Sequence, residues 1–144
     1  MDTTDQYIKM CEKATEIKGV WDIKCGDYVV VDKYKDRRLA LITERTSQDF
    51  AIVAFPYASP PNRDMHRIEN MIPLPRQDQL QEMREGLEIN SHVPYKQLLS
   101  VCEWLCQQGL PPLRPMSMEM IWLAFVMHTK YNKAWDGENW ISSE

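Results

Sequence analysis

Cysteine and histidine are the residues in this sequence that could ligate a metal or attack a substrate, and the chain has four cysteines and three histidines. Cys102 and Cys106 would share one face of a helix, where two thiolates could hold zinc together with two further ligands. The other thiols, Cys11 and Cys25, have spacings that match no zinc ribbon or finger. Free cysteine is among the most buried residue types, so we expect Cys102 and Cys106 to pack in a core and expect no metal site.

The histidines form no catalytic set. His66, His92 and His128 are far apart in the sequence, and none has a second histidine at helical spacing with a glutamate between them. Proton transfer near neutral pH needs a positioned partner group. The chain also lacks a glycine-rich phosphate loop and a Gly-x-Ser-x-Gly motif. The sequence therefore indicates neither an enzyme nor a bound cofactor.

The segment IPLPRQDQL, residues 72–80, is the most unusual stretch of the chain. Its two prolines favour an extended approach to a helix whose first turn is polar. The forked guanidinium of Arg76 and the free N–H groups of such a helix start could grip a carboxylate or a phosphate. A stiff junction in which Arg76 pairs with Asp78 is the simpler alternative.

Tryptophan, tyrosine and arginine dominate the hot spots of protein interfaces. Trp135 and Trp140 flank an Asp-Gly pair, which is a strong signal for a hairpin turn and would bring the two rings together on short arms. A small-ligand pocket beneath these tryptophans is an alternative to a protein interface. The residues that we expect to contact a protein partner are Tyr57, Arg76, Asp78, Trp135 and Trp140.

Basic residues gather on the first predicted hairpin, at Lys33, Lys35, Arg37, Arg38 and Arg45. One interpretation is a phosphate-contacting surface, whose binding to nucleic acid would fall steeply with salt. Acidic residues are interleaved, however, at Asp32, Asp36 and Glu44. A formal net charge of -4 also lacks the basic excess that is typical of nucleic-acid-binding domains. The sequence thus favours a mixed, soluble sheet edge that deters pairing with other chains.

The apolar run 121–127 is seven residues long, whereas a helix needs about 20 residues to span a bilayer. The first residues of the chain are polar and charged and show no signal-peptide segment. We therefore expect no membrane contact, a cytoplasmic location and cysteines in their reduced form.

The elements that must position these residues suggest one domain, 1–144, because the length of 144 residues leaves little room for two. Residues 1–21 predict a helix. Residues 22–56 predict an antiparallel sheet, because β-branched and aromatic segments alternate with polar turns. The expected strands lie at 28–31, 39–43 and 50–55.

The second half of the chain has a different pattern. Residues 57–75 are rich in proline and predict a long loop of functional interest. Residues 76–144 predict a helical part, with helices at 76–85, 94–108 and 118–131. The expected fold class is α+β, with an N-terminal helix, a three-stranded antiparallel meander and a helical C-terminal half closed by a turn that bears Trp135 and Trp140. An uncovered apolar sheet face would require a dimer, but these helices could cover it within one chain.

Three blocks of the sequence, YIKMCEKATEI, IPLPRQDQLQEM and IWLAFVMHTKYNKAWDGENWI, resemble a family of small proteins encoded by bacteriophages and prophages. The resemblance implies an accessory protein that acts in the host bacterial cytoplasm, and it supplies no catalytic residue. It favours a protein that binds a host protein, such as an inhibitor of bacterial defence or of a CRISPR effector. The alternatives are a nucleic-acid-associated phage protein that uses the basic hairpin 33–45, or a small-ligand-binding protein.

Overall fold

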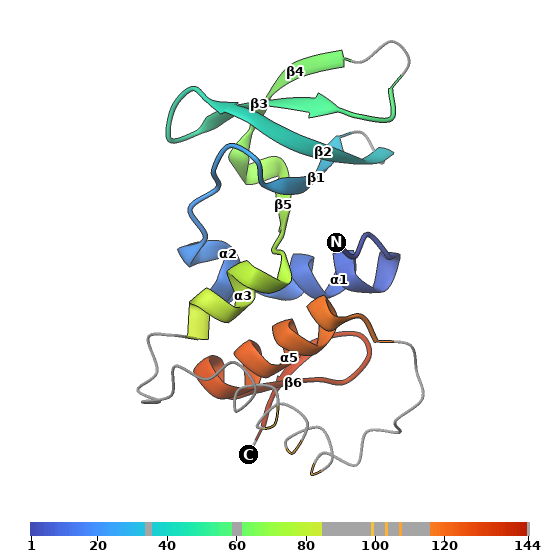
Figure 1. Ribbon diagram of the computed structural model, residues 1–144, viewed down its shortest axis with the longest axis vertical. Helices are drawn as coiled ribbons and strands as arrows, with labels where there is room; N and C mark the ends of the chain where they lie inside the picture. Colours follow the sequence, from blue (N-terminus) through green and yellow to red (C-terminus); the bar gives the residue numbers. More distant parts are fainter. Residues whose placement is uncertain are drawn as a thin grey trace. The chain divides into compact units, whose positions relative to one another are not determined.

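The computed structural model describes residues 1–33, 36–58, 62–84, 99, 103, 107 and 116–143. The chain divides into two compact units. One unit is Thr3–Pro75, and the other comprises Met1–Asp2 with Arg76–Glu144. Each unit has its own secondary structure and is described by itself (Figure 1).

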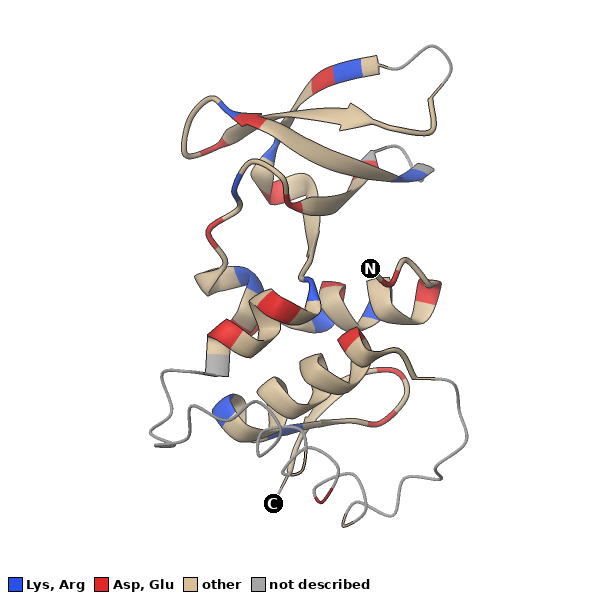
Figure 2. Ribbon diagram, viewed as in Figure 1, with Lys and Arg blue, Asp and Glu red and all other residues tan. Residues whose placement is uncertain are grey.

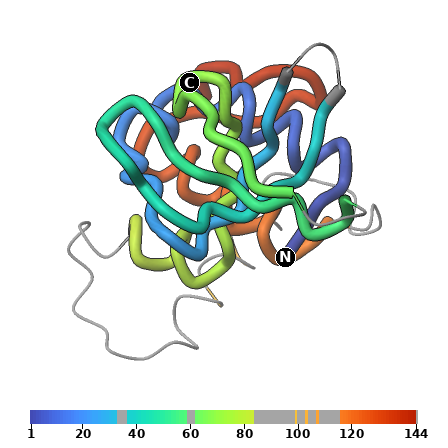
Figure 3. The backbone as a smooth tube through the Cα atoms, turned by 90° about the horizontal axis from the view of Figure 1, so that it is seen from above, coloured from blue at the N-terminus to red at the C-terminus, as the bar shows by residue number. Residues whose placement is uncertain are grey.

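The unit Thr3–Pro75 contains one five-stranded antiparallel sheet in the order β4-β3-β2-β1-β5. Figure 3 shows β2, β3 and β4 running side by side. The last strand returns to the far side of β1, so the sheet edges are β4 and β5. The elements of this unit are α1 (Asp5–Lys13), α2 (Thr15–Val20), β1 (Tyr28–Lys33), β2 (Asp36–Arg45), β3 (Phe50–Phe55), β4 (Asn62–Arg67), the 3-10 helix η1 (Ile68–Asn70) and β5 (Met71–Leu74).

The expected three-stranded meander is therefore wrong, although the α+β class is confirmed. The region 57–75, expected to be a loop, contributes β4, η1 and β5. The sequence of β4, NRDMHR, lacks the β-branched pattern that predicts a strand, but its charges suit an exposed sheet edge. Pro73 lies inside β5 and is tolerated there because an edge strand has one side on which no backbone N–H is needed.

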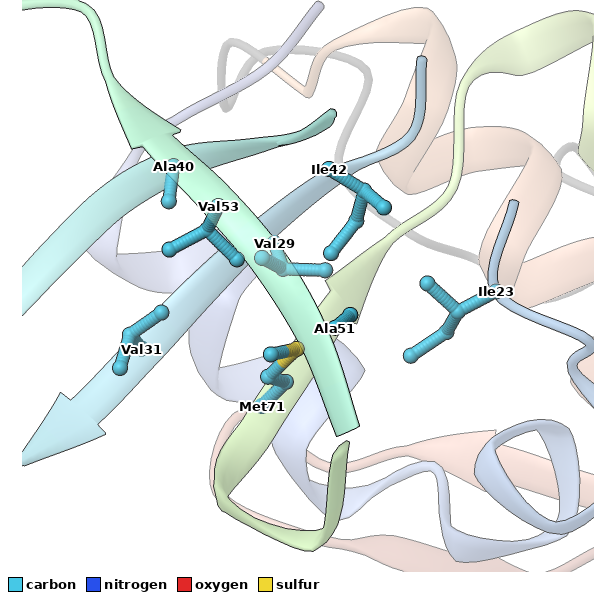
Figure 4. Close-up of a cluster of buried hydrophobic side chains, with 8 residues drawn as sticks. All are labelled: Ile23, Val29, Val31, Ala40, Ile42, Ala51, Val53 and Met71. Atoms are coloured by element: carbon cyan, nitrogen blue, oxygen red, sulfur yellow. The ribbon is translucent and has the colours of Figure 1, made fainter. Parts of the chain in front are cut away.

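One face of the sheet forms an apolar core (Figure 4). The pairing of β2 with β3 shifts between Ile42 and Glu44, and the hydroxyl of the extra residue, Thr43, donates to the Ile52 carbonyl at 3.1 Å. Because side chains alternate along a strand, this extra residue allows Ile42 to face the core and Glu44 to face water. The buried side chains of this face are Ile23, Val29, Val31, Ala40, Ile42, Ala51, Val53 and Met71.

The N-terminal helix packs against β5 in the same unit. Thr4 caps α1 by accepting a hydrogen bond from the Tyr7 amide, and the Tyr7 hydroxyl donates to the Pro75 carbonyl at 2.5 Å. The single helix expected over residues 1–21 is in fact two, because Ala14 leaves helical geometry with a ψ of 66°. The buried Tyr7 thus fixes α1 to the end of β5.

The second unit contains α3 (Gln77–Arg84), α5 (Met118–Tyr131), β6 (Lys133–Trp135) and β7 (Trp140–Ser142). The expected helical C-terminal half is wrong as a description, because the segment that bears Trp135 and Trp140 forms a two-stranded antiparallel sheet of β6 and β7. The helix expected over 94–108, together with Cys102 and Cys106, lies outside the described residues except for residues 99, 103 and 107.

The helix α5 begins as the sequence predicts. Ser117 accepts a hydrogen bond from the Met120 amide at 3.1 Å, and the Ser117 hydroxyl donates to the Asp2 carboxylate. Residues 122–127 are all buried, which confirms the expectation that the apolar helix belongs to a core. Within the described parts of the chain, no helix is long and apolar enough to cross a membrane.

Candidate interaction surface

The five residues expected to contact a partner do not belong to one unit. Tyr57 lies in Thr3–Pro75, and the other four lie in Arg76–Glu144. Tyr57 follows β3 in a turn closed by a hydrogen bond from the Ala58 amide to the Phe55 carbonyl. Its side chain is 85% exposed, so it contributes little to packing and is open to a partner.

Arg76 and Asp78 form the internal pair that was the simpler alternative for this segment. The Arg76 Nε and Nη2 atoms lie 3.1 and 3.2 Å from the two carboxylate oxygens of Asp78. The hydrogen bond from Arg76 lowers the pKa of Asp78, and the positive charge of Arg76 lowers it further. Slight burial of the Asp78 carboxylate opposes both effects. The Gln79 side chain accepts a hydrogen bond from the Arg76 amide at 2.9 Å. This junction is thus built to start α3, and its guanidinium fork is already occupied.

Trp135 and Trp140 lie opposite each other in the β6–β7 hairpin, which confirms the expected proximity. Their ring centroids are 5.0 Å apart at an interplanar angle of 58°. The turn between them is held by the Asp136 carboxylate, which accepts hydrogen bonds from the Glu138 and Asn139 amides, both at 2.7 Å. Only 8% of Trp140 is exposed, so this ring stabilises the hairpin and presents little surface to a partner.

Two cations of the basic hairpin, Arg37 and Arg45, pair with acidic residues of the chain. Arg37 Nη2 lies 3.1 and 3.0 Å from the two carboxylate oxygens of Glu12. Arg45 pairs with Asp22 and donates from Nε to the Ser47 carbonyl at 3.1 Å. Arg38 also has an interaction of its own. Lys35 and the side chain of Lys33 lie outside the described residues.

A surface that the sequence did not suggest lies on the outer side of β2, β3 and β4. Strand register places its residues opposite the core: Ala54 pairs with Leu41 and Arg63, and Ile52 pairs with Glu44 and Met65. We call this surface the open sheet face. It consists of Leu41, Glu44, Phe50, Ile52, Ala54, Arg63, Met65 and Arg67.

The centre of the open sheet face is apolar and only partly shielded from water. Phe50, Ile52 and Ala54 are half-buried although they occupy an inner strand of the sheet. Met65 is 58% exposed on the edge strand β4. Exposed apolar patches rimmed by polar residues commonly mark interaction sites, so this centre is the strongest candidate surface of the unit.

Charges of both signs border this apolar centre, and strands β2 and β4 both carry acidic and basic residues (Figure 2). The guanidinium of Arg67 lies 5.5 Å above the Phe50 ring and pairs with Glu69 at 3.2 Å. Arg63 and Glu44 are exposed and form no ion pair with any described residue. These two charges are therefore available to a partner.

A hollow of about 380 Å³ opens at the Phe50 end of the face. It lies between the turn that precedes β3 and the junction of β4 with η1, where the Ile68 amide donates to the Asp49 carbonyl at 2.8 Å. Carboxylates, a guanidinium and apolar groups line it together, so it suits an amphipathic side chain better than a single ion. The lining residues are Gln48, Asp49, Phe50, Arg67, Ile68 and Glu69.

Sequence reasoning missed this surface because it treated 57–75 as a loop. Without β4, neither the neighbours of β3 nor the position of Met65 could be inferred. One signal was present in the sequence. The strand FAIVAF is apolar at every position, so both of its faces are expected to pack against other groups. Among the described residues, only the side chains on the face of Ala51 and Val53 are fully buried.

Comparison with known proteins adds no family or fold relative, because no family model, no curated protein and no solved structure matches the chain. Among the described residues, no group of three or more His, Cys, Asp or Glu is placed to hold a metal ion.

Proposed function

We propose that this chain is a bacteriophage or prophage accessory protein that acts by binding a host protein through the open sheet face. The observation that carries the proposal is an apolar strip over β3 and β4, half-buried along Ile52 and Ala54 and exposed at Met65, beside Arg63, which pairs with no acidic group among the described residues. Burial of apolar surface is the main source of favourable energy in most protein association. Unpaired border charges add specificity and speed to the encounter.

The partner that fits this face has an apolar ridge with a carboxylate on one flank and a cation on the other. Register determines the arrangement, because Arg63 and Arg67 lie on β4, to one side of β3, and Glu44 lies on β2, to the other side. A partner with the opposite arrangement would place like charges together, which disfavours it. The proposed phage origin directs the search to components of bacterial defence, such as CRISPR effectors, in the host cytoplasm.

Nucleic acid is the weaker alternative for the same unit. Binding to phosphates requires cations that are free to release counterions, and Arg37 and Arg45 instead pair with acidic residues of the chain. Glu44 on the open sheet face would also repel a phosphate backbone. Binding that falls steeply with salt and disappears with nuclease would favour this alternative.

The test is capture of host proteins from nuclease-treated lysate, followed by binding of the purified candidate. Met65→Ser removes the apolar anchor, and Arg63→Glu reverses the free cation. Ile141→Ser is the matched control, because Ile141 is 49% exposed but lies in the other unit.

We expect one host protein that binds the pure chain in a defined ratio. Its affinity should fall at least tenfold in both face variants and remain unchanged in the control. The proposal is wrong if affinity survives both changes, or if binding depends on Trp135 and Arg76 instead.

A further inference from the structure

The charges of the open sheet face are arranged so that the face complements itself. Across the strands, one row reads Glu44, Ile52, Met65 and the next reads Leu41, Ala54, Arg63. The free carboxylate and the free guanidinium thus lie on opposite sides of β3, one row apart. A surface that carries both signs on opposite flanks of an apolar strip can be its own partner.

We infer that two copies of the chain pack open sheet face to open sheet face, about a two-fold axis parallel to β3. This rotation exchanges the two flanks, so β2 of one copy lies over β4 of the other. Glu44 of one copy then lies over Met65 of the second copy, one row from the second copy's Arg63, and the symmetry repeats the contact. The apolar centres meet between these two contacts, with Ile52 and Ala54 of each copy facing their equivalents.

The other face-to-face arrangement is disfavoured. A two-fold axis across the strands would lay β4 over β4, and Arg63 of one copy would face Arg67 of the other. Like charges in direct opposition oppose association. The charge pattern therefore selects one of the two symmetric packings. Among the described residues, Glu44 and Arg63 form no ion pair and Arg67 forms one, with Glu69.

The size of the face predicts a weak, reversible dimer. Three strands spaced by about 4.8 Å and six residues long at about 3.4 Å each give a face of roughly 10 by 20 Å. This is smaller than the roughly 800 Å² per partner of a standard protein interface. We therefore expect monomer and dimer to exchange and their ratio to change with concentration.

Dimerisation would also regulate binding at this face. A second copy covers Ile52, Ala54 and Met65, so a host partner can bind only when the dimer dissociates. This competition rests on the proposed function, whereas the dimer itself does not. Affinity for the host protein should fall as the concentration of the chain rises.

The decisive experiment is a charge exchange read by sedimentation velocity of the purified, untagged chain. Glu44→Arg places arginine one row from Arg63 of the second copy, and Arg63→Glu places two carboxylates at the same spacing. Each variant alone should dimerise at least tenfold more weakly than the natural chain. An equimolar mixture should recover the dimer. In the mixed dimer the introduced arginine of one variant meets the introduced glutamate of the other, and the second contact regains the natural pair of Glu44 with Arg63.

Glu82→Arg serves as the control, because Glu82 is an exposed carboxylate on α3 in the other unit. Its dimer should equal that of the natural chain. Recovery in the mixture also shows that both exchanged variants fold. The inference is overturned if the natural chain stays monomeric into the hundreds of micromolar, if either single variant dimerises normally, or if the mixture does not recover. These readings need no host protein, so they fail or succeed separately from the proposed function.

Discussion

Truncation of two isoleucines tests which face of the sheet is the core. Ile42 on β2 and Ile52 on β3 are the same residue type on opposite faces. Ile42 is fully buried, so Ile42→Ala should cost about 2–5 kcal/mol through lost burial and the cavity left behind. Ile52 is half-buried on the open sheet face, and Ile52→Ala should cost about 1 kcal/mol because water already reaches part of the side chain.

Hydrogen–deuterium exchange of the strand amides is the suitable assay. It reports the local free energy of opening and does not require the two units to unfold together. A loss of about 2 kcal/mol makes exchange roughly 30-fold faster in β1, β2 and β3, and the Ile52 variant should show a several-fold effect at most. Equal losses, or a larger loss for Ile52→Ala, would refute the assignment of the two faces.

The same pair of variants also bears on the dimer. If a second copy covers the open sheet face, the effect of Ile52→Ala should grow with protein concentration, because binding of a partner adds to stability by mass action. The effect of Ile42→Ala should stay constant, because its surroundings are complete within one copy.

Three further predictions concern the second unit. Ser117→Ala removes the cap of α5 and the donor to Asp2, and should lower the free energy of unfolding by about 1 kcal/mol, measured by urea titration. The interaction with Arg76 lowers the pKa of Asp78 in the folded chain. The Asp78 carboxylate therefore stabilises the fold at pH values above its unfolded pKa, and this stabilisation is lost as the pH falls through the folded pKa. An NMR titration should therefore show the Asp78 pKa rising in Arg76→Gln. Gly137 has a φ of 108°, so Gly137→Ala should strain the turn by about 1 kcal/mol or more and weaken the exciton signal of the tryptophan pair in circular dichroism.

The sequence correctly predicted the elements whose formation depends on residues close by in the sequence. Ser117 caps α5 as expected, because a cap needs only its own first turn. The Asp-Gly pair produces the hairpin that joins Trp135 and Trp140, because the turn chemistry lies within four residues. The three strands of the first hairpins were found for the same reason, since each has a β-branched or aromatic run of its own.

The missed strands depend on residues that are distant in sequence. β4 is a polar edge strand that is held by pairing with β3, and its own sequence gives no strand pattern. β5 pairs with β1, more than 30 residues earlier in the chain, and contains a proline that normally argues against a strand. The open sheet face follows from both pairings together, so no local pattern could have shown it. The sequence identified the junction at Arg76 and Asp78. It left open whether Arg76 pairs with Asp78 or binds an external anion, and the structure shows the internal pair.

The most direct test of the account is site-specific photo-crosslinking in the bacterial host. A benzoylphenylalanine placed at position 65 reports what contacts the open sheet face, and the same residue at position 141 reports a comparably exposed apolar site of the other unit. We expect crosslinks from position 65 to a host protein at low expression and to a second copy of the chain at high expression, with neither from position 141. Crosslinks from position 141 alone, with none from position 65, would contradict it.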